Sequence, residues 1–310
     1  MTPSIIANIA QNISSENSLK CEIFDEKKMK ELGMGGLLSV SQGSNEPAKL
    51  IVIRHDGGNN DPIVIIGKGV TFDSGGISIK PSPKMDEMKF DKSGAATVIG
   101  AIKSISLLKL PINVIAIVPL TENLLSGSSY KPGDVITHYG GKTSEIMNTD
   151  AEGRIVLCDA LAEADSEYPE LIIDIATLTG AARVALGTDL PAVFTGSDEI
   201  AIALCAAGIK MDDPIWRLPL HQPYRDMLKS SVADLNNVAD SGFGGAITAA
   251  LYLQTFVEDS SRWLHIDTYG WNDKERPGRP AGGDGLATVS YTHLRAHETR
   301  HDLVCRLLLE

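Results

Sequence analysis

The sequence predicts an α/β fold in which a mainly parallel mixed sheet is sandwiched between helices on both faces. Short, β-branched apolar runs alternate with segments of helical length along most of the 310 residues. Continuous apolar runs are typical of strands buried on both faces, and their alternation with helices is typical of a parallel sheet. A hydrophobic content of 43% is ample for one large core.

The apolar runs and the helical periodicities place the expected elements along the chain. The expected strands are residues 50–53, 63–66, 114–118, 171–175 and 263–266. The expected helices are residues 4–12, 25–32, 95–108, 155–164, 199–211 and 246–256, where apolar side chains recur at helical spacing. Because no repeat or low-complexity linker interrupts this order, we expect residues 1–290 to form one domain.

The composition argues against several classes of protein. A formal net charge of −12 disfavours nucleic acids and anionic membranes as partners. The four cysteines show no C-x-x-C spacing, which argues against a zinc ribbon or a redox pair and fits a reducing compartment. The chain start shows no leader pattern, and no apolar run approaches the length of a membrane span. We therefore expect a soluble, cytoplasmic protein.

The run 148–154, with the sequence NTDAEGR, is the most informative stretch of the chain. In an extended segment, residues two apart face the same way, so Asp150, Glu152 and Arg154 would project toward one pocket. Two carboxylates that close repel each other unless a cation lies between them. The run therefore predicts a metal site that needs further oxygen ligands.

Further ligands are expected upstream. Lys68 and Asp73 are predicted to lie on the loop after the strand 63–66, at the end of the sheet where open α/β folds place their sites. Asp91 precedes a stretch with helical periodicity, residues 93–108, and is expected near the N-terminus of that helix.

Six segments resemble the catalytic domain of the leucine aminopeptidase (cytosol aminopeptidase) family. They follow the family's order and spacing over roughly the first 285 residues, and they read GKGVTFDSGGISIK, MKFDKSGAATVIG, NTDAEGRIVLCDAL, ATLTGAARVALG, WRLPL with SVADLNNV, and GGAITAALYL. The resemblance implies a two-metal aminopeptidase that hydrolyses the N-terminal residue from short peptides through a metal-bridging hydroxide. It also implies a homohexamer.

The resemblance also implies a set of metal ligands. Asp73 and Glu152 would bridge two metal ions, Asp150 would bind the first, and Lys68 and Asp91 would bind the second. Four carboxylates nearly balance two divalent cations, and oxygen ligands suit Zn²⁺, Mn²⁺ or Mg²⁺. Lys68 can ligate only as a neutral amine, which a neighbouring dication and burial both favour. The alternative for Lys68 is a cation that neutralises nearby acids.

Other roles follow from the resemblance as well. Lys80 would donate to the oxyanion of the tetrahedral intermediate, and Arg154 would hold a bicarbonate ion that acts as general base. The alternative for Lys80 is a solvated surface lysine. The alternative for Arg154 is a structural salt bridge with a nearby acid.

The resemblance also suggests where the substrate binds. Met88 and Thr177 would contact its first residue, while Leu178 and Gly180 would offer backbone groups; an ordinary core role for Met88 is the alternative. The bulky stretch 267–272 lies where the rest of this pocket is expected, so a leucine preference stays open.

Two other functions remain open at this stage. A two-metal phosphoesterase also uses carboxylate-bridged metals, although it predicts more histidine ligands than the sequence offers. An inactive oligomerisation scaffold is the second, because the family's N-terminal domain is expected to be absent before Met1. Residues 291–310 are expected to be a non-native tail, in which the regular spacing of His293, His297, His301 and Cys305 is attributed to artefact rather than to a zinc site.

Overall fold

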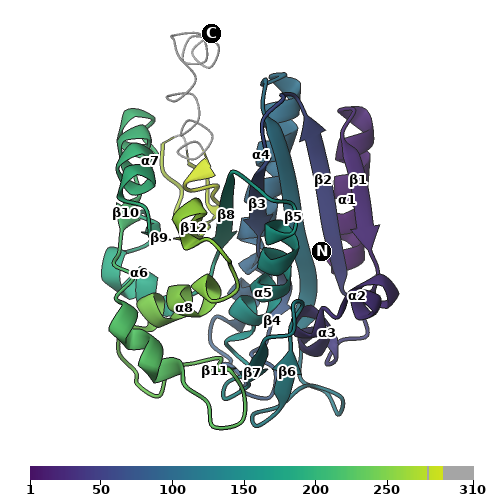
Figure 1. The fold of residues 1–310 in the computed structure, drawn as a ribbon, viewed down its shortest axis with the longest axis vertical. Helices are drawn as coiled ribbons and strands as arrows, with labels where there is room; N and C mark the ends of the chain where they lie inside the picture. Colours follow the sequence, from purple (N-terminus) through teal and green to yellow (C-terminus); the bar gives the residue numbers. More distant parts are fainter. Residues whose placement is uncertain (278, 289–310) are drawn as a thin grey trace.

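A mixed nine-stranded sheet forms the centre of the computed structural model, which describes residues 1–277 and 279–288. Its strands follow the order β1-β2-β5-β3-β8-β12-β9-β10, and β4 pairs with β5 (Figure 1). They are β1 Lys20–Phe24, β2 Lys49–Asp56, β3 Ile63–Gly67, β4 Gly69–Asp73, β5 Asn113–Asn123, β8 Leu171–Ala176, β9 Ala192–Thr195, β10 Trp216–Arg217 and β12 Trp263–Asp267. The strands β5, β3, β8 and β12 run parallel, while β1, β2 and β9 add antiparallel pairings.

Smaller sheets and helices complete the described part of the chain. The small strands are β6 Val135–Thr137, β7 Thr143–Glu145, β11 Leu235–Asn236, β13 Trp271–Asn272 and β14 Gly282–Gly283. The α-helices are α1 Pro3–Glu16, α2 Glu26–Leu32, α3 Gly35–Ser41, α4 Ser93–Leu107, α5 Glu152–Asp165, α6 Gly180–Leu186, α7 Asp198–Lys210 and α8 Gly245–Gln254. Three 3₁₀ helices are η1 Met85–Phe90, η2 Gln222–Leu228 and η3 Ser260–Arg262.

The sheet divides the interior into two apolar cores. Successive strand residues point to opposite faces, so Leu50 packs in one core while Ile51 packs in the other. The core that contains Leu50 is closed by α2, α3, α5 and α8, and the core that contains Ile51 is closed by α1, α4 and α7. The predicted α/β class, with helices on both faces of a mixed sheet, is confirmed.

All five predicted strands and all six predicted helices occur, with ends shifted by a few residues. The helices α3 and α6 were not predicted, because, unlike α2 of the same length, they carry almost no charged side chains and so show no polar face that marks a helical period. Residues 291–310, which include the expected tail and its three histidines, lie outside the described residues. Within residues 1–277 and 279–288, none of the helices is both long and apolar enough to cross a lipid bilayer.

A polar network lies buried inside the sheet. His265 on β12 faces Asp174 on β8 as a cross-strand pair, and His265 Nδ1 lies 2.5 Å from Asp174 Oδ1. Trp263 Nε1 donates to the other carboxylate oxygen at 2.8 Å. Burial alone would lower the pKa of His265, but the Asp174 carboxylate outweighs it and raises that pKa above its ordinary value.

This network predicts a pH-dependent contribution to stability. Because the folded-state pKa of His265 is raised, its stabilisation is fully present below about pH 6.5 and is lost as the pH rises through the folded-state value. We expect His265→Gln to lower the free energy of unfolding by about 1–3 kcal/mol at acidic pH and by less at alkaline pH. Urea unfolding from pH 5 to 9 measures the difference. The Asp174→Asn variant should abolish this pH dependence. If the wild type and His265→Gln differ in free energy of unfolding by the same amount at every pH, the proposed role of the pair is contradicted.

Candidate metal centre

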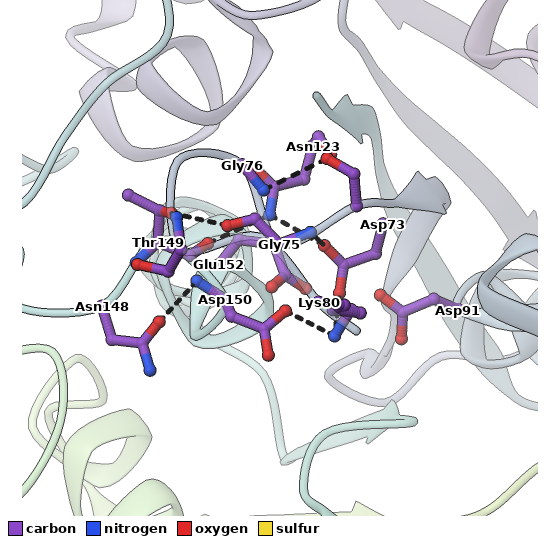
Figure 2. Close-up of polar contacts among 12 residues, drawn as sticks. Asp73, Gly75, Gly76, Lys80, Asp91, Asn123, Asn148, Thr149, Asp150 and Glu152 are labelled. Atoms are coloured by element: carbon purple, nitrogen blue, oxygen red, sulfur yellow. Dashed lines mark hydrogen bonds and ion pairs between the residues drawn. The ribbon is translucent and has the colours of Figure 1, made fainter. Parts of the chain in front are cut away.

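The predicted ligands come together where the carboxyl ends of the central strands meet the starts of two helices. Lys68 follows β3, Asp73 ends β4, Asp91 precedes α4, and Glu152 begins α5. Figure 2 shows Asp73, Asp91, Asp150 and Glu152 converging on one space. The loop position predicted for Asp73 is wrong, because the chain returns to the sheet after Lys68 and pairs with β5 as far as Asp73.

The extended conformation predicted for the run 148–154 is also wrong. Thr149 and Asp150 form a turn, in which the amide of Asp150 donates to Asn148 Oδ1 at 2.8 Å, and α5 begins at Glu152. A carboxylate in the first turn interacts favourably with the partial positive charge of a helix N-terminus, which explains this early start. The two acids therefore converge through a turn and a helix start rather than through strand alternation.

The carboxylates are close together and mostly buried. One oxygen each from Asp73, Asp91 and Glu152 lies within 4.8 Å of the others. Lys68 Nζ lies 2.8 Å from Asp91 Oδ1 and 3.0 Å from Glu152 Oε1, which is the ion-pair arrangement held as the alternative for this lysine. Asp150 lies at the more open edge of the cluster.

Lys80 lies on the side of the cluster where Asp150 is found. Its Nζ is 2.5 Å from Asp150 Oδ1 and 2.8 Å from Asp73 Oδ2 (Figure 2). The alternative of a fully solvated lysine is therefore wrong, because its side chain is only 20% exposed and is paired.

The charges of the cluster do not balance. Four carboxylates face two ammonium groups, which leaves a formal excess of two negative charges in a largely buried site. Burial, reinforced by Asp73, raises the pKa of Glu152 well above its ordinary value. Burial raises the pKa of Asp91 to about 6, although Lys68 pulls it down. Asp91 Oδ2 also has no hydrogen-bond partner among the described residues. The cluster is compact and buried, offers many oxygen ligands and has too little positive charge nearby. It therefore fits divalent cations.

Neighbouring polar groups orient the carboxylates. Asn123 Nδ2 donates to Asp73 Oδ1 at 2.8 Å and to the Thr149 carbonyl at 3.0 Å, so it ties the end of β4 to the turn before α5. The Gly75 amide also donates to Asp73 Oδ1, at 2.8 Å. Thr177 Oγ1 donates to Asp91 Oδ1 at 2.7 Å. Asn123 was not among the residues predicted from the sequence, because the strand was expected to end at residue 118, whereas β5 continues to Asn123.

Arg154 has no carboxylate within ion-pair distance among the described residues, so the salt-bridge alternative is wrong. Its Nη1 donates to the carbonyl of Asn237 at 2.8 Å, and its guanidinium lies 5.9 Å from the ring centroid of Tyr252. The Nε atom is buried without a partner. Arg154 therefore keeps donor capacity at the wall of the site.

A pocket of about 510 Å³ opens onto the cluster. The four residues expected to bind substrate all line it, namely Met88, Thr177, Leu178 and Gly180. The bulky stretch after β12 also reaches the pocket, through Tyr269 and through Trp271, which stacks on Phe90.

Gly153 lets Lys68 approach α5. A Cβ atom added at Gly153 would lie 2.6 Å from both Cε and Nζ of Lys68, closer than a Cβ atom comes to a non-bonded atom. Gly100 in α4 is a matched helical glycine with open space around its Cβ position.

These two glycines give opposite predictions. We expect Gly153→Ala to displace the Lys68 side chain, to lower the free energy of unfolding by about 1–3 kcal/mol and to weaken divalent metal binding. Gly100→Ala should instead stabilise the chain by up to about 1 kcal/mol through helix propensity. Urea unfolding without metal and calorimetric titration with Mn²⁺ measure both effects. If the two variants change the free energy of unfolding and the Mn²⁺ affinity equally, the close approach of Lys68 to Gly153 is unimportant.

Known proteins of similar sequence belong to one family. The profile described as "Cytosol aminopeptidase family, catalytic domain" matches residues 1–291. The probable cytosol aminopeptidase of Nitrosomonas europaea is 49% identical over 286 residues, which cover 90% of this chain and 57% of that protein. The corresponding protein of Albidiferax ferrireducens is 50% identical over 290 residues, covering 93% and 60%.

Solved structures give the same result. The crystal structure of cytosol aminopeptidase from Coxiella burnetii superposes with a TM-score of 0.92 at 45% identity, over 97% of this chain and 65% of that one. The bottromycin maturation enzyme BotP in complex with Mn superposes with a TM-score of 0.91 at 39% identity, over 96% and 66%. The chain thus spans less than two thirds of the length of these proteins.

Proposed function

The chain belongs to the cytosol aminopeptidase family, and from this premise we propose that it acts as a metal-dependent aminopeptidase that releases the N-terminal residue of short peptides. The observation that carries the proposal is the buried cluster of Asp73, Asp91 and Glu152, whose close carboxylates lack enough positive charge. The cluster opens onto a pocket with room for part of a peptide.

Two divalent cations are proposed to bind Lys68, Asp73, Asp91, Asp150 and Glu152. The oxygen-rich donor set supports Mn²⁺, Zn²⁺ or Mg²⁺, and the related BotP enzyme is described in complex with Mn. When bound, such cations supply Lewis acidity toward the scissile carbonyl and activate water for attack. The cluster of acids contains no histidine among the described residues, which disfavours the phosphoesterase alternative.

The chain's own residues would then position and polarise the substrate. The Lys80 ammonium lines the pocket and is proposed to donate a hydrogen bond to the oxyanion that develops on the scissile carbonyl. The unpartnered Nε of Arg154 supports binding of a small planar anion such as bicarbonate, held as a general base. Met88 and Thr177 are proposed to contact the first residue of the peptide, and Leu178 and Gly180 its backbone.

The setting of the enzyme is inferred from its relatives. Their names place them in the cytosol, and we propose the same location for this protein. A homo-oligomer, a single catalytic domain over residues 1–290 and a non-native tail over residues 291–310 remain proposals from the sequence.

The proposed activity can be tested with leucine p-nitroanilide. We expect turnover by the 310-residue protein with added Mn²⁺ or Zn²⁺, and its loss on chelation. Lys80→Gln should lower kcat by about 100- to 1000-fold with a smaller change in KM, because the oxyanion loses a donor. Lys131→Gln removes an exposed lysine paired with Asp134 and serves as the control. A folded, metal-loaded protein without turnover would favour an inactive scaffold instead.

A further inference from the structure

One charged residue on the pocket wall is not used by the proposed chemistry. Besides the proposed ligands and Lys80, the charged residues that line the pocket are Glu87, Arg154, Arg183 and Asp267. Glu87 is paired with Lys84 at 3.2 Å, and Arg154 donates to the carbonyl of Asn237. Asp267 accepts hydrogen bonds from the amides of Leu178 and Thr179. The side chain of Arg183, which is exposed, forms no ion pair and no hydrogen bond with any other described residue, and only its backbone carbonyl accepts a hydrogen bond, from the Gly187 amide.

Arg183 stands on a well-anchored helix. It is the fourth residue of α6, one helical turn beyond Gly180, so the two residues lie on the same side of the helix. Thr179 caps α6 by accepting from the Ala182 amide at 3.0 Å. The same hydroxyl donates to Asp267 Oδ2 at 2.6 Å, which fixes the start of α6 to the end of β12.

The guanidinium of Arg183 lies over the ring of a tyrosine. The guanidinium carbon lies 5.0 Å from the ring centroid of Tyr269, within the range of a cation–π contact. Tyr269 follows Asp267 by two residues, and its hydroxyl donates to Asp273 Oδ1 at 3.2 Å. A stacked guanidinium keeps the N–H donors on its edge free, and this fork suits a carboxylate bound through two hydrogen bonds.

The position of Arg183 limits which carboxylate it can reach. Gly180 is proposed to lie along the substrate backbone, and the three residues from Gly180 to Arg183 advance about 4.5 Å along the helix. One peptide residue spans at most about 3.6 Å, so a carboxylate bound by Arg183 would belong to a residue next to the scissile bond. Two sources fit this chemistry: the side chain of an acidic N-terminal residue and the C-terminal carboxylate of a dipeptide.

We propose that Arg183 is a specificity-determining residue that binds a carboxylate of the substrate, adjacent to the scissile bond. The inference rests on the proposed aminopeptidase function. A guanidinium at this place favours anionic substrates locally, whereas the formal net charge of the whole chain, −12, disfavours them. Tyr269 contributes by orienting the guanidinium before the substrate arrives.

Matched substrates that differ by one charge test the proposal. The first pair is glutamate and glutamine p-nitroanilide, and the second is the dipeptide Leu-Gly and its C-terminal amide. Arg183→Gln should lower kcat/KM for the anionic member of a pair by about 10- to 100-fold, mainly through KM, and leave the neutral member within about twofold. Arg183→Lys keeps the charge but not the fork, and should fall between the wild type and Arg183→Gln.

The controls separate a local carboxylate site from a general charge effect. Lys84→Gln removes a positive charge beside Glu87 and should leave both substrate ratios unchanged. If Arg183→Gln lowers kcat/KM for the anionic substrate of the first pair alone, the bound group is the acidic side chain. If it does so for the second pair alone, the bound group is the C-terminal carboxylate. If Arg183→Gln changes neither ratio, or changes neutral and anionic substrates equally, the proposal is overturned.

A binding measurement keeps the proposal testable apart from turnover. Failure of the wild type to hydrolyse leucine p-nitroanilide would refute the proposed function rather than the carboxylate site. Calorimetric titration of the metal-loaded protein then measures the affinities for L-glutamate, L-glutamine, Leu-Gly and its amide. These affinities allow the same two comparisons between an anionic ligand and its neutral partner. Weaker binding of an anionic ligand by Arg183→Gln, with its neutral partner unchanged, supports the site, and equal affinities in the wild type and the variant overturn it.

Discussion

The arrangement of the site depends on one electrostatic constraint, which is that four carboxylates must share a largely buried space. Lys68 and Lys80 approach to within hydrogen-bond distance of all four, yet they supply half of the charge required for neutrality. Carboxylates that lack compensation in a low dielectric repel one another and hold their protons. The surrounding backbone has to keep these groups together against that repulsion, and the site uses elements from separate parts of the chain to do so.

The hydrogen bonds around the cluster show how this is achieved. Asn123, at the end of β5, links Asp73 on β4 to the turn that precedes α5. Thr177, just after β8, holds Asp91 ahead of α4. Gly153 removes the side chain that would otherwise push Lys68 out of the site. Each of these residues joins elements far apart in sequence, so the position of every carboxylate depends on the packing of the whole sheet.

The parts of the structure that the sequence predicted well are those in which the physical signal is local. The strand 63–66 is a continuous apolar run with few alternatives, and it was placed correctly. The start of α5 was missed because acidic and basic side chains at alternate positions imitate a strand, whereas the helix N-terminus and the Asn148 turn decide the conformation. The anchoring of α6 depends on Asp267, 88 residues beyond Thr179, and no local pattern contains such information. The complete ligand set was expected from motif resemblance, and the apolar run 63–66 by itself predicted that Lys68 lies at the end of the sheet.

The carboxylate cluster and the rest of the pocket lining are carried by different elements, which has a consequence for how the pocket can change. The acids lie at the end of β4, before α4 and at the start of α5, whereas another part of the pocket lining comes from α6 and from the residues that follow β12. Asp267 joins the start of α6 to the end of β12, because it accepts hydrogen bonds from the amides of Leu178 and Thr179 and from the Thr179 hydroxyl. These contacts do not depend on the identity of residues 183, 269 or 271. Substitutions at those three positions can therefore change the shape of the pocket while the hydrogen bonds that anchor α6 stay in place.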